Sequence, residues 1–192
     1  MTPDIKAPGH SGQTTPYTVS MMKANIIAML APLPLFLILF YGYRALWGRI
    51  YPAGFIQNHP LVILAVPLVF VLGIAAHEFL HAFTWVKLGQ KNFNLIKFGI
   101  DRKTLSPYAH LKEPVNIRIY RWGVLMPGLI LGLIPVFFGF ILGISPLFLF
   151  GIFFTYAAGG DFLVLWLLRK VPGHLIVEDH PAEVGCLVHE DG

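Results

Sequence analysis

The amino-acid sequence predicts an all-α membrane protein with about four transmembrane helices and a short cytoplasmic loop. The first observation is composition: 56% of the 192 residues are hydrophobic, only 12% are charged, and the mean hydropathy is +0.67. The second is that the hydrophobic residues gather in runs of about 20, the length of helix that crosses a bilayer. Such runs are typical of a polytopic membrane protein rather than a soluble domain with one core.

Cysteine content and charge narrow the classes of function. Cys186 is the only cysteine, which excludes an internal disulfide and a zinc site built from thiolates, so histidine and carboxylate must hold any metal. The formal charge of +4 and the pI of about 9.3 are those of a basic protein. In a membrane protein this excess more often reflects orientation in the bilayer, so no nucleic-acid partner is inferred.

The chain divides into three expected parts. Residues 1–23 are rich in Pro, Gly, Ser and Thr and are expected to form a disordered N-terminal tail. Residues 24–171 are expected to form the transmembrane domain, and residues 172–192 a short cytoplasmic tail that is a small soluble appendage. Pro32 and Pro34 are expected to kink the first span or to mark its start. The four expected spans cover residues 24–47, 61–88, 122–143 and 147–168.

Basic residues predict the orientation. Residues 87–121 hold eight of the fourteen Lys and Arg side chains against two acids, so the positive-inside rule places this loop in the cytoplasm. Four spans then place both termini in the cytoplasm, and the protein in the inner or plasma membrane. Imperfect apolar alternation over residues 93–100, followed by a turn signal at residues 101–103, favours a β-hairpin near the membrane surface. The alternative is an unstructured basic linker.

The second span carries the pentad His77-Glu78-Phe79-Leu80-His81. Residues four apart share a helix face, so His77 and His81 can present two imidazoles to one metal, with Glu78 about 100° around the helix beside them. Two nitrogen ligands and a carboxylate placed to take a proton from water are the zincin arrangement. Ionisable groups are costly inside a bilayer, which strengthens the motif here. The alternative is a buried polar cluster that joins helices by hydrogen bonds.

A catalytic zinc usually takes three protein ligands, so the pentad needs a partner from elsewhere. Glu78 and Asp161 are the only carboxylates within the four spans. His77 lies about 24 Å into its span and Asp161 about 22 Å into the last one, and both helices run inward. Gly159 and Gly160 would let the last helix approach closely or unwind. We therefore expect Asp161 to be the third ligand, against the alternative of an interhelical hydrogen bond or ion pair.

The remaining histidines are weaker candidates. His110 lies in the basic loop, where it could steady a substrate carbonyl, although a loop histidine is more often solvated. His174, His180 and His189 lie in the acidic tail and are expected to be surface residues.

These residues resemble a known group. The pentad, with Gly89 following, is similar to the zinc-binding helix of the site-2 protease class of intramembrane metalloproteases, in which a later helix supplies an aspartate ligand. The match is closer to a compact bacterial family of zincin-type membrane peptidases of unknown function, and covers about residues 61–187. In that family the HExxH helix is followed, in order, by four further motifs. They are a loop histidine (here His110), a proline (Pro127), a Gly-Asp pair (Gly160-Asp161) and a terminal Asp-His-Pro (Asp179-His180-Pro181). Against the larger class, the last helix has Gly-Gly-Asp-Phe in place of Leu-Asp-Gly.

The expected function is a Zn²⁺-dependent endopeptidase embedded in the lipid bilayer that hydrolyses peptide bonds of membrane-protein or peptide substrates. His77, His81 and Asp161 are the expected metal ligands, with Glu78 as the catalytic base and His110 as a helper. The main alternative is a metal-binding but non-proteolytic scaffold or regulatory subunit. A second alternative is an ion or proton conductor that uses the same polar residues as a relay.

Overall fold

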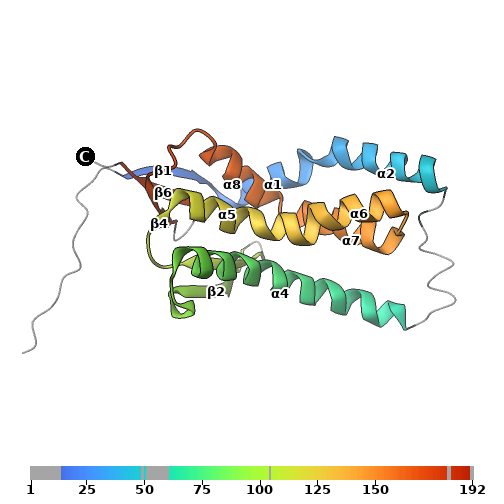
Figure 1. The fold of residues 1–192 in the computed structure, drawn as a ribbon, viewed down its shortest axis with the longest axis horizontal. Helices are drawn as coiled ribbons and strands as arrows, with labels where there is room; N and C mark the ends of the chain where they lie inside the picture. The colour runs from blue at the N-terminus through green and yellow to red at the C-terminus, as the bar shows by residue number, and fades with distance from the viewer. Residues whose placement is uncertain (1–13, 49, 51–60, 104, 181–182, 191–192) are drawn as a thin grey trace, which may run out of the picture.

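The computed structural model shows an elongated helical bundle with β-strands gathered at one end (Figure 1). It describes residues 14–48, 50, 61–103, 105–180 and 183–190. The helices are α1 (Met21–Leu30), α2 (Leu33–Trp47), α4 (Val62–Gly89), α5 (Ile117–Pro127), α6 (Ile134–Leu142), α7 (Ser145–Ala157) and α8 (Gly159–Leu168). A π-helical segment, Gly128–Leu133, joins α5 to α6 without a break.

Three helical stretches among the described residues are long and apolar enough to cross a membrane: Met21–Trp47, Leu64–Gly89 and Ile117–Leu142. Helices α7 and α8 bend by 49° at their junction and make a fourth span only if the pair crosses as one. Large apolar side chains are exposed on α1, α2, α4 and α6, as contact with lipid requires. The structure is therefore consistent with the predicted membrane protein, and it shows three of the four expected spans as helical stretches of sufficient length.

The breaks fall where proline and glycine predicted them. The first span is interrupted at Ala31-Pro32, between α1 and α2, as the prolines indicated. The last span is interrupted at Ala158, directly before Gly159 and Gly160. This second break places Asp161 in the first turn of α8.

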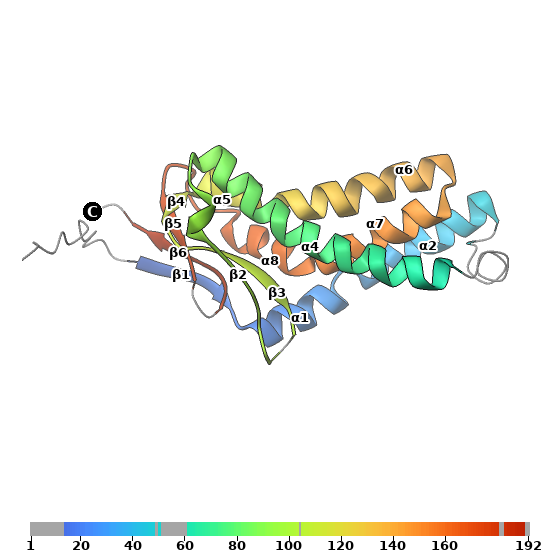
Figure 2. The ribbon, with the colours of Figure 1, turned by 90° about the horizontal axis from the view of Figure 1, so that it is seen from below.

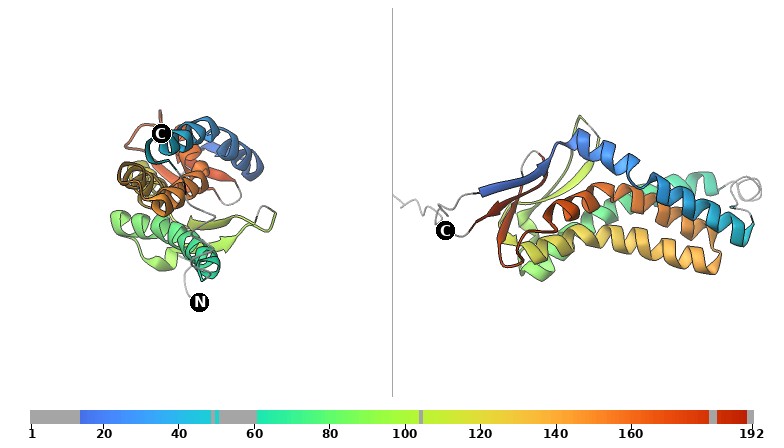
Figure 3. Two further views of the ribbon diagram at one scale, coloured as in Figure 1. Left: turned by 90° about the vertical axis from the view of Figure 1, so that its right-hand side faces the viewer. Right: turned by 90° about the horizontal axis from the view of Figure 1, so that it is seen from above.

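A four-stranded antiparallel sheet closes one end of the bundle (Figure 3). Its strands lie in the order β1 (Thr14–Val19), β6 (Val184–His189), β5 (Ile176–Asp179) and β4 (Val115–Asn116). This sheet corrects the expectation of an all-α fold with a disordered N-terminal tail, because Thr14–Val19 form strand β1; residues 1–13 lie outside the described part. Composition misled here, since Thr and Val suit a strand once a partner is available. Strands β5 and β6 are likewise part of this sheet, rather than an appendage to the bundle.

A second, two-stranded sheet is the hairpin of β2 (Ile96–Ile100) and β3 (Pro107–Leu111), preceded by a 3₁₀ turn at Phe93–Leu95. It confirms the hairpin predicted in the basic loop. Figure 2 shows it leaving the sheet end and running along the bundle toward α1.

The main hydrophobic core lies where α4, α5 and α8 meet the four-stranded sheet. Trp85, Tyr120, Leu168 and Val177 are among its buried members. A smaller core around Tyr43, Val136 and Phe148 lies apart from the first. The polar residues described below lie beside the larger core, which holds their helices in place.

Candidate metal centre

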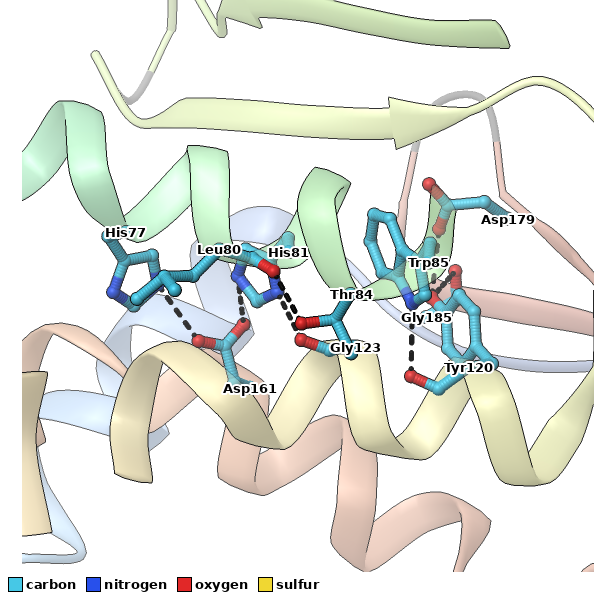
Figure 4. A network of polar contacts seen from close by, with 10 residues as sticks. All are labelled: His77, Leu80, His81, Thr84, Trp85, Tyr120, Gly123, Asp161, Asp179 and Gly185. Carbon is cyan, nitrogen blue, oxygen red and sulfur yellow. Dashed lines mark hydrogen bonds and ion pairs between the residues drawn. The ribbon is translucent and has the colours of Figure 1, made fainter. Parts of the chain in front are cut away.

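The pentad lies within helix α4, as the sequence predicted. His77 and His81 occupy one face and are nearly enclosed, with 8% and 6% of their surface exposed. Figure 4 shows both imidazoles pointing from α4 toward α8. Helical periodicity alone therefore brings the two ring nitrogens together.

Asp161 completes a cluster between α4 and α8. One carboxylate oxygen, Oδ2, lies 3.0 Å from Nε2 of His77, and the other, Oδ1, lies 3.4 Å from Nε2 of His81 (Figure 4). One ligand atom from each of the three residues lies within 4.8 Å of the others. Asp161 thus meets His77 and His81, which precede it by 84 and 80 positions, as the similar distances along the two expected spans predicted.

The donor set fits Zn²⁺. Nδ1 of His81 lies 2.9 Å from the carbonyl oxygen of Gly123, which can only accept, so Nδ1 carries a proton. In the neutral ring the lone pair of Nε2 faces an Asp161 oxygen that also only accepts, and either a metal cation between them or a second proton on His81 reconciles the two. Ligands of a tetrahedral zinc with bonds of about 2.0–2.2 Å lie roughly 3.3 Å apart, close to the separations found here.

Trp85 and Gly123 contact the His81 imidazole on the side away from Asp161. The Trp85 ring stacks on the His81 imidazole at 5.5 Å and donates from Nε1 to the Tyr120 carbonyl at 3.1 Å. A Cβ on Gly123 would lie 1.9 Å from Nε1 of Trp85, so only glycine allows α5 to approach α4 this closely. The same close approach brings the Gly123 carbonyl to His81. We conclude that the α4–α5 contact orients the imidazole of His81.

Glu78 lies beside the cluster without belonging to it. Its half-buried carboxylate is near the backbone amide of Ala109 on β3. Glu78, the three candidate ligands and the hairpin all line one cavity of about 700 Å³. A carboxylate next to the metal position, and facing a space large enough for a peptide segment, meets the requirements for a general base.

His110 lies on β3 and lines the same cavity, but it contacts a residue that the sequence did not single out as functional. Its Nδ1 lies 3.0 Å from Oδ2 of Asp179 on β5. The Tyr120 hydroxyl donates to Oδ1 of Asp179 at 2.8 Å, and the backbone amide of Leu111 donates to Oδ2 at 3.3 Å. The terminal Asp-His-Pro motif was the only sequence signal for Asp179, and it gave no role.

The other candidates lie elsewhere. Glu113 pairs with Lys91 at 2.7 Å. In the C-terminal region His174 is exposed, as expected, whereas His180 and His189 are half-buried in the fold. Burial raises the pKa of the Cys186 thiol to about 12, so this cysteine stays protonated and is a poor nucleophile.

The fold and the cluster have the features of one class of protein: apolar helices that could span a membrane and a buried group of two histidines and an aspartate that could bind a metal. Residues 69–176, more than half of the chain, match the model of a family described as "Putative zincin peptidase", and the chain belongs to that family. Family membership supports a metallopeptidase with a zinc cofactor in general terms. No curated protein and no solved structure matches the chain. The matched region includes His77, His81, His110 and Asp161 but ends before Asp179.

Proposed function

We propose that this protein is a zinc-dependent endopeptidase that hydrolyses peptide bonds of membrane proteins in or at the bilayer. The observation that carries the proposal is the meeting of His77 and His81 with Asp161 inside an apolar bundle, beside the Glu78 carboxylate and a cavity. The resemblance to the site-2 protease class supports the same reaction.

Each residue has a distinct task in this reaction. His77, His81 and Asp161 would hold Zn²⁺, whose chemistry at this position is to activate water and to polarise a carbonyl group. Glu78 accepts the proton of the attacking water and returns it to the leaving amine. His110 holds the carbonyl oxygen of the substrate as negative charge develops there. The cavity orients the peptide and limits the water that enters.

The hairpin offers a way to hold an extended substrate. A helix hides its carbonyls, so a transmembrane substrate has to unwind before cleavage. Among the described residues, β2 and β3 pair as strands only with each other. The outward amides of β3 at Ala109 and Leu111 contact Glu78 and Asp179, so the outer edge of β2 is the one available to a substrate strand. Phe98 and Ile100 are 52% and 64% exposed on β2. We propose that the unwound substrate pairs with this hairpin; unchanged cleavage of all tested membrane substrates after Phe98→Ser and Ile100→Ser would exclude this role.

Glu78→Gln tests the reaction itself. The purified variant is expected to retain about one zinc per chain while losing cleavage of membrane-protein substrates, because Gln keeps the shape but cannot accept a proton. A regulatory scaffold would keep its cellular effect in this variant, and an ion conductor would lose flux without producing fragments. Wild type that contains no zinc after chelator-free purification would contradict the proposal.

A further inference from the structure

The mechanism gives no task to Asp179, a largely enclosed acid that lines the cavity. Asp179 lies on β5, in the C-terminal region that was expected to be a soluble tail, and its side chain is only 14% exposed. It lines the cavity together with Glu78 and His110. An enclosed carboxylate needs partners that offset the loss of water, and the identity of those partners indicates its use.

Three donors fix the Asp179 carboxylate. The Tyr120 hydroxyl bonds one oxygen, whereas the Leu111 amide and Nδ1 of His110 bond the other. Tyr120 comes from α5 and the other two donors come from β3, so the carboxylate joins three elements. Because two of these partners are held rigidly, the position of Asp179 determines the orientation of the third, the imidazole of His110.

The contact also determines which nitrogen of His110 is free. A carboxylate only accepts, so Nδ1 carries a proton and Nε2 becomes the end available to a ligand. Among the described residues, no hydrogen bond to Nε2 is found. The hydrogen bond to Asp179 raises the pKa of His110 above its ordinary value, which favours the form with a proton on both nitrogens.

We propose that Asp179 is a positioning residue that orients His110 so that Nε2–H donates to the carbonyl oxygen of the substrate. This inference rests on the proposed peptidase function. It makes the four-stranded sheet part of the catalytic unit, since β5 holds Asp179 in place through pairing with β6 and β4. The His110–Asp179 pair is separate from the metal ligands, so it affects turnover without affecting metal binding.

The charges around His110 determine how the test is designed. Asp179 on β5 bonds His110, and the charge of Glu178, which pairs with His189, raises the pKa of His110 further. Lys97 lies opposite His110 on β2 and lowers that pKa, and Glu78 on α4 lies near the backbone of Ala109, the residue before His110. Glu178 is the matched control, because Glu178→Gln removes the same charge one residue away from Asp179. Asp179→Asn removes the charge of the carboxylate and keeps its size.

The test measures His110 directly and then measures turnover. Nitrogen NMR of histidine-labelled protein in detergent, with His110 assigned by its loss in His110→Gln, is expected to show a lower pKa in Asp179→Asn and little change in Glu178→Gln. Zinc content is expected to stay near one per chain in all three variants. An unchanged His110 pKa in Asp179→Asn, or zinc loss in that variant, would overturn the positioning role.

Steady-state kinetics of the variants are the second test of the proposal. His110→Gln is expected to lower kcat about 100-fold, as loss of one donor to a developing oxyanion does, with a smaller change in KM. Asp179→Asn is expected to lower kcat about 10-fold or more, and the double variant should be no slower than His110→Gln alone. Additive losses would show that the two residues act independently and would overturn the proposal. Absence of cleavage by wild type would refute the peptidase function, while the NMR arm would still decide whether Asp179 orients His110.

Discussion

Two histidine–aspartate contacts in this protein use the same chemical groups and differ in how the chain brings them together. His77 and Asp161 meet between two helices inside the bundle, 84 positions apart, at 3.0 Å. His110 and Asp179 meet between two strands beside the bundle, 69 positions apart, also at 3.0 Å. The first contact belongs to a cluster of three candidate metal ligands, whereas in the second the aspartate is also held by a tyrosine and a backbone amide. We infer that the two contacts have different roles despite their equal distances: the first belongs to a site for metal binding, and the second orients His110.

The largest expected effect separates these two roles. His81→Ala and Asp161→Ala should each abolish stoichiometric zinc and lower activity by more than the ~10–100-fold that changes around a ligand cause. His110→Gln should retain zinc. Elemental analysis of protein purified in detergent measures the difference. Thr84→Ala is the control on the same helix, because the Thr84 hydroxyl bonds only the Leu80 carbonyl (Figure 4); zinc loss in this control would show that the helix, rather than the ligand, was disturbed.

Sequence predicted the helical contact because its geometry is nearly local. His77 and His81 share a face by helical periodicity, and the lengths of two spans set Asp161 at the same depth. Prolines and the Gly159-Gly160 pair predicted the breaks in the first and last spans. These inferences need only the rise of a helix and the thickness of a bilayer.

Sequence did not predict the strand contact because pairing between strands is not local. Strand β1 pairs with β6, which lies 165 or more residues away, and neither strand has a long alternating pattern. Nothing in the run around Asp179 shows that it will face His110. The segments that form β1, β5 and β6 were therefore predicted as parts of tails, and the residue that orients His110 was missed with them.

The second largest effect concerns how α4 and α5 approach each other behind His81. Gly123→Ala should destabilise the protein by about 1–3 kcal/mol, because the new methyl group overlaps the Trp85 ring and forces the helices apart. Gly160→Ala is the control, since no atom lies within 4 Å of a Cβ added there. Thermal unfolding in detergent measures both variants. Equal melting temperatures would mean that Trp85 moves at little cost and that the close contact does not hold the metal site.

A smaller effect is expected from the protonation of His110. Its raised pKa means that the folded state binds this proton more tightly than the unfolded state does. The resulting stability is fully present below the unfolded pKa of about 6.5 and is lost as the pH rises through the higher folded value. The contribution is about 1 kcal/mol, that of one charged hydrogen bond partly open to water. Denaturant unfolding across this pH range should show the loss in wild type and not in His110→Gln; parallel curves would contradict it.

The smallest effect is expected at an ion pair whose contact is shorter than either histidine–aspartate contact. Lys91 Nζ lies 2.7 Å from Glu113 Oε2, but the two side chains are 26% and 45% exposed. Water screens this pair and ordering two long side chains opposes it, so Glu113→Gln should change stability by about 0.5 kcal/mol or less and leave zinc and turnover unchanged. Thermal unfolding measures the stability of Glu113→Gln, and elemental analysis compares its zinc content with that of His81→Ala. A large loss at Glu113 would mean that distance, rather than enclosure and the number of shared partners, determines what these contacts contribute.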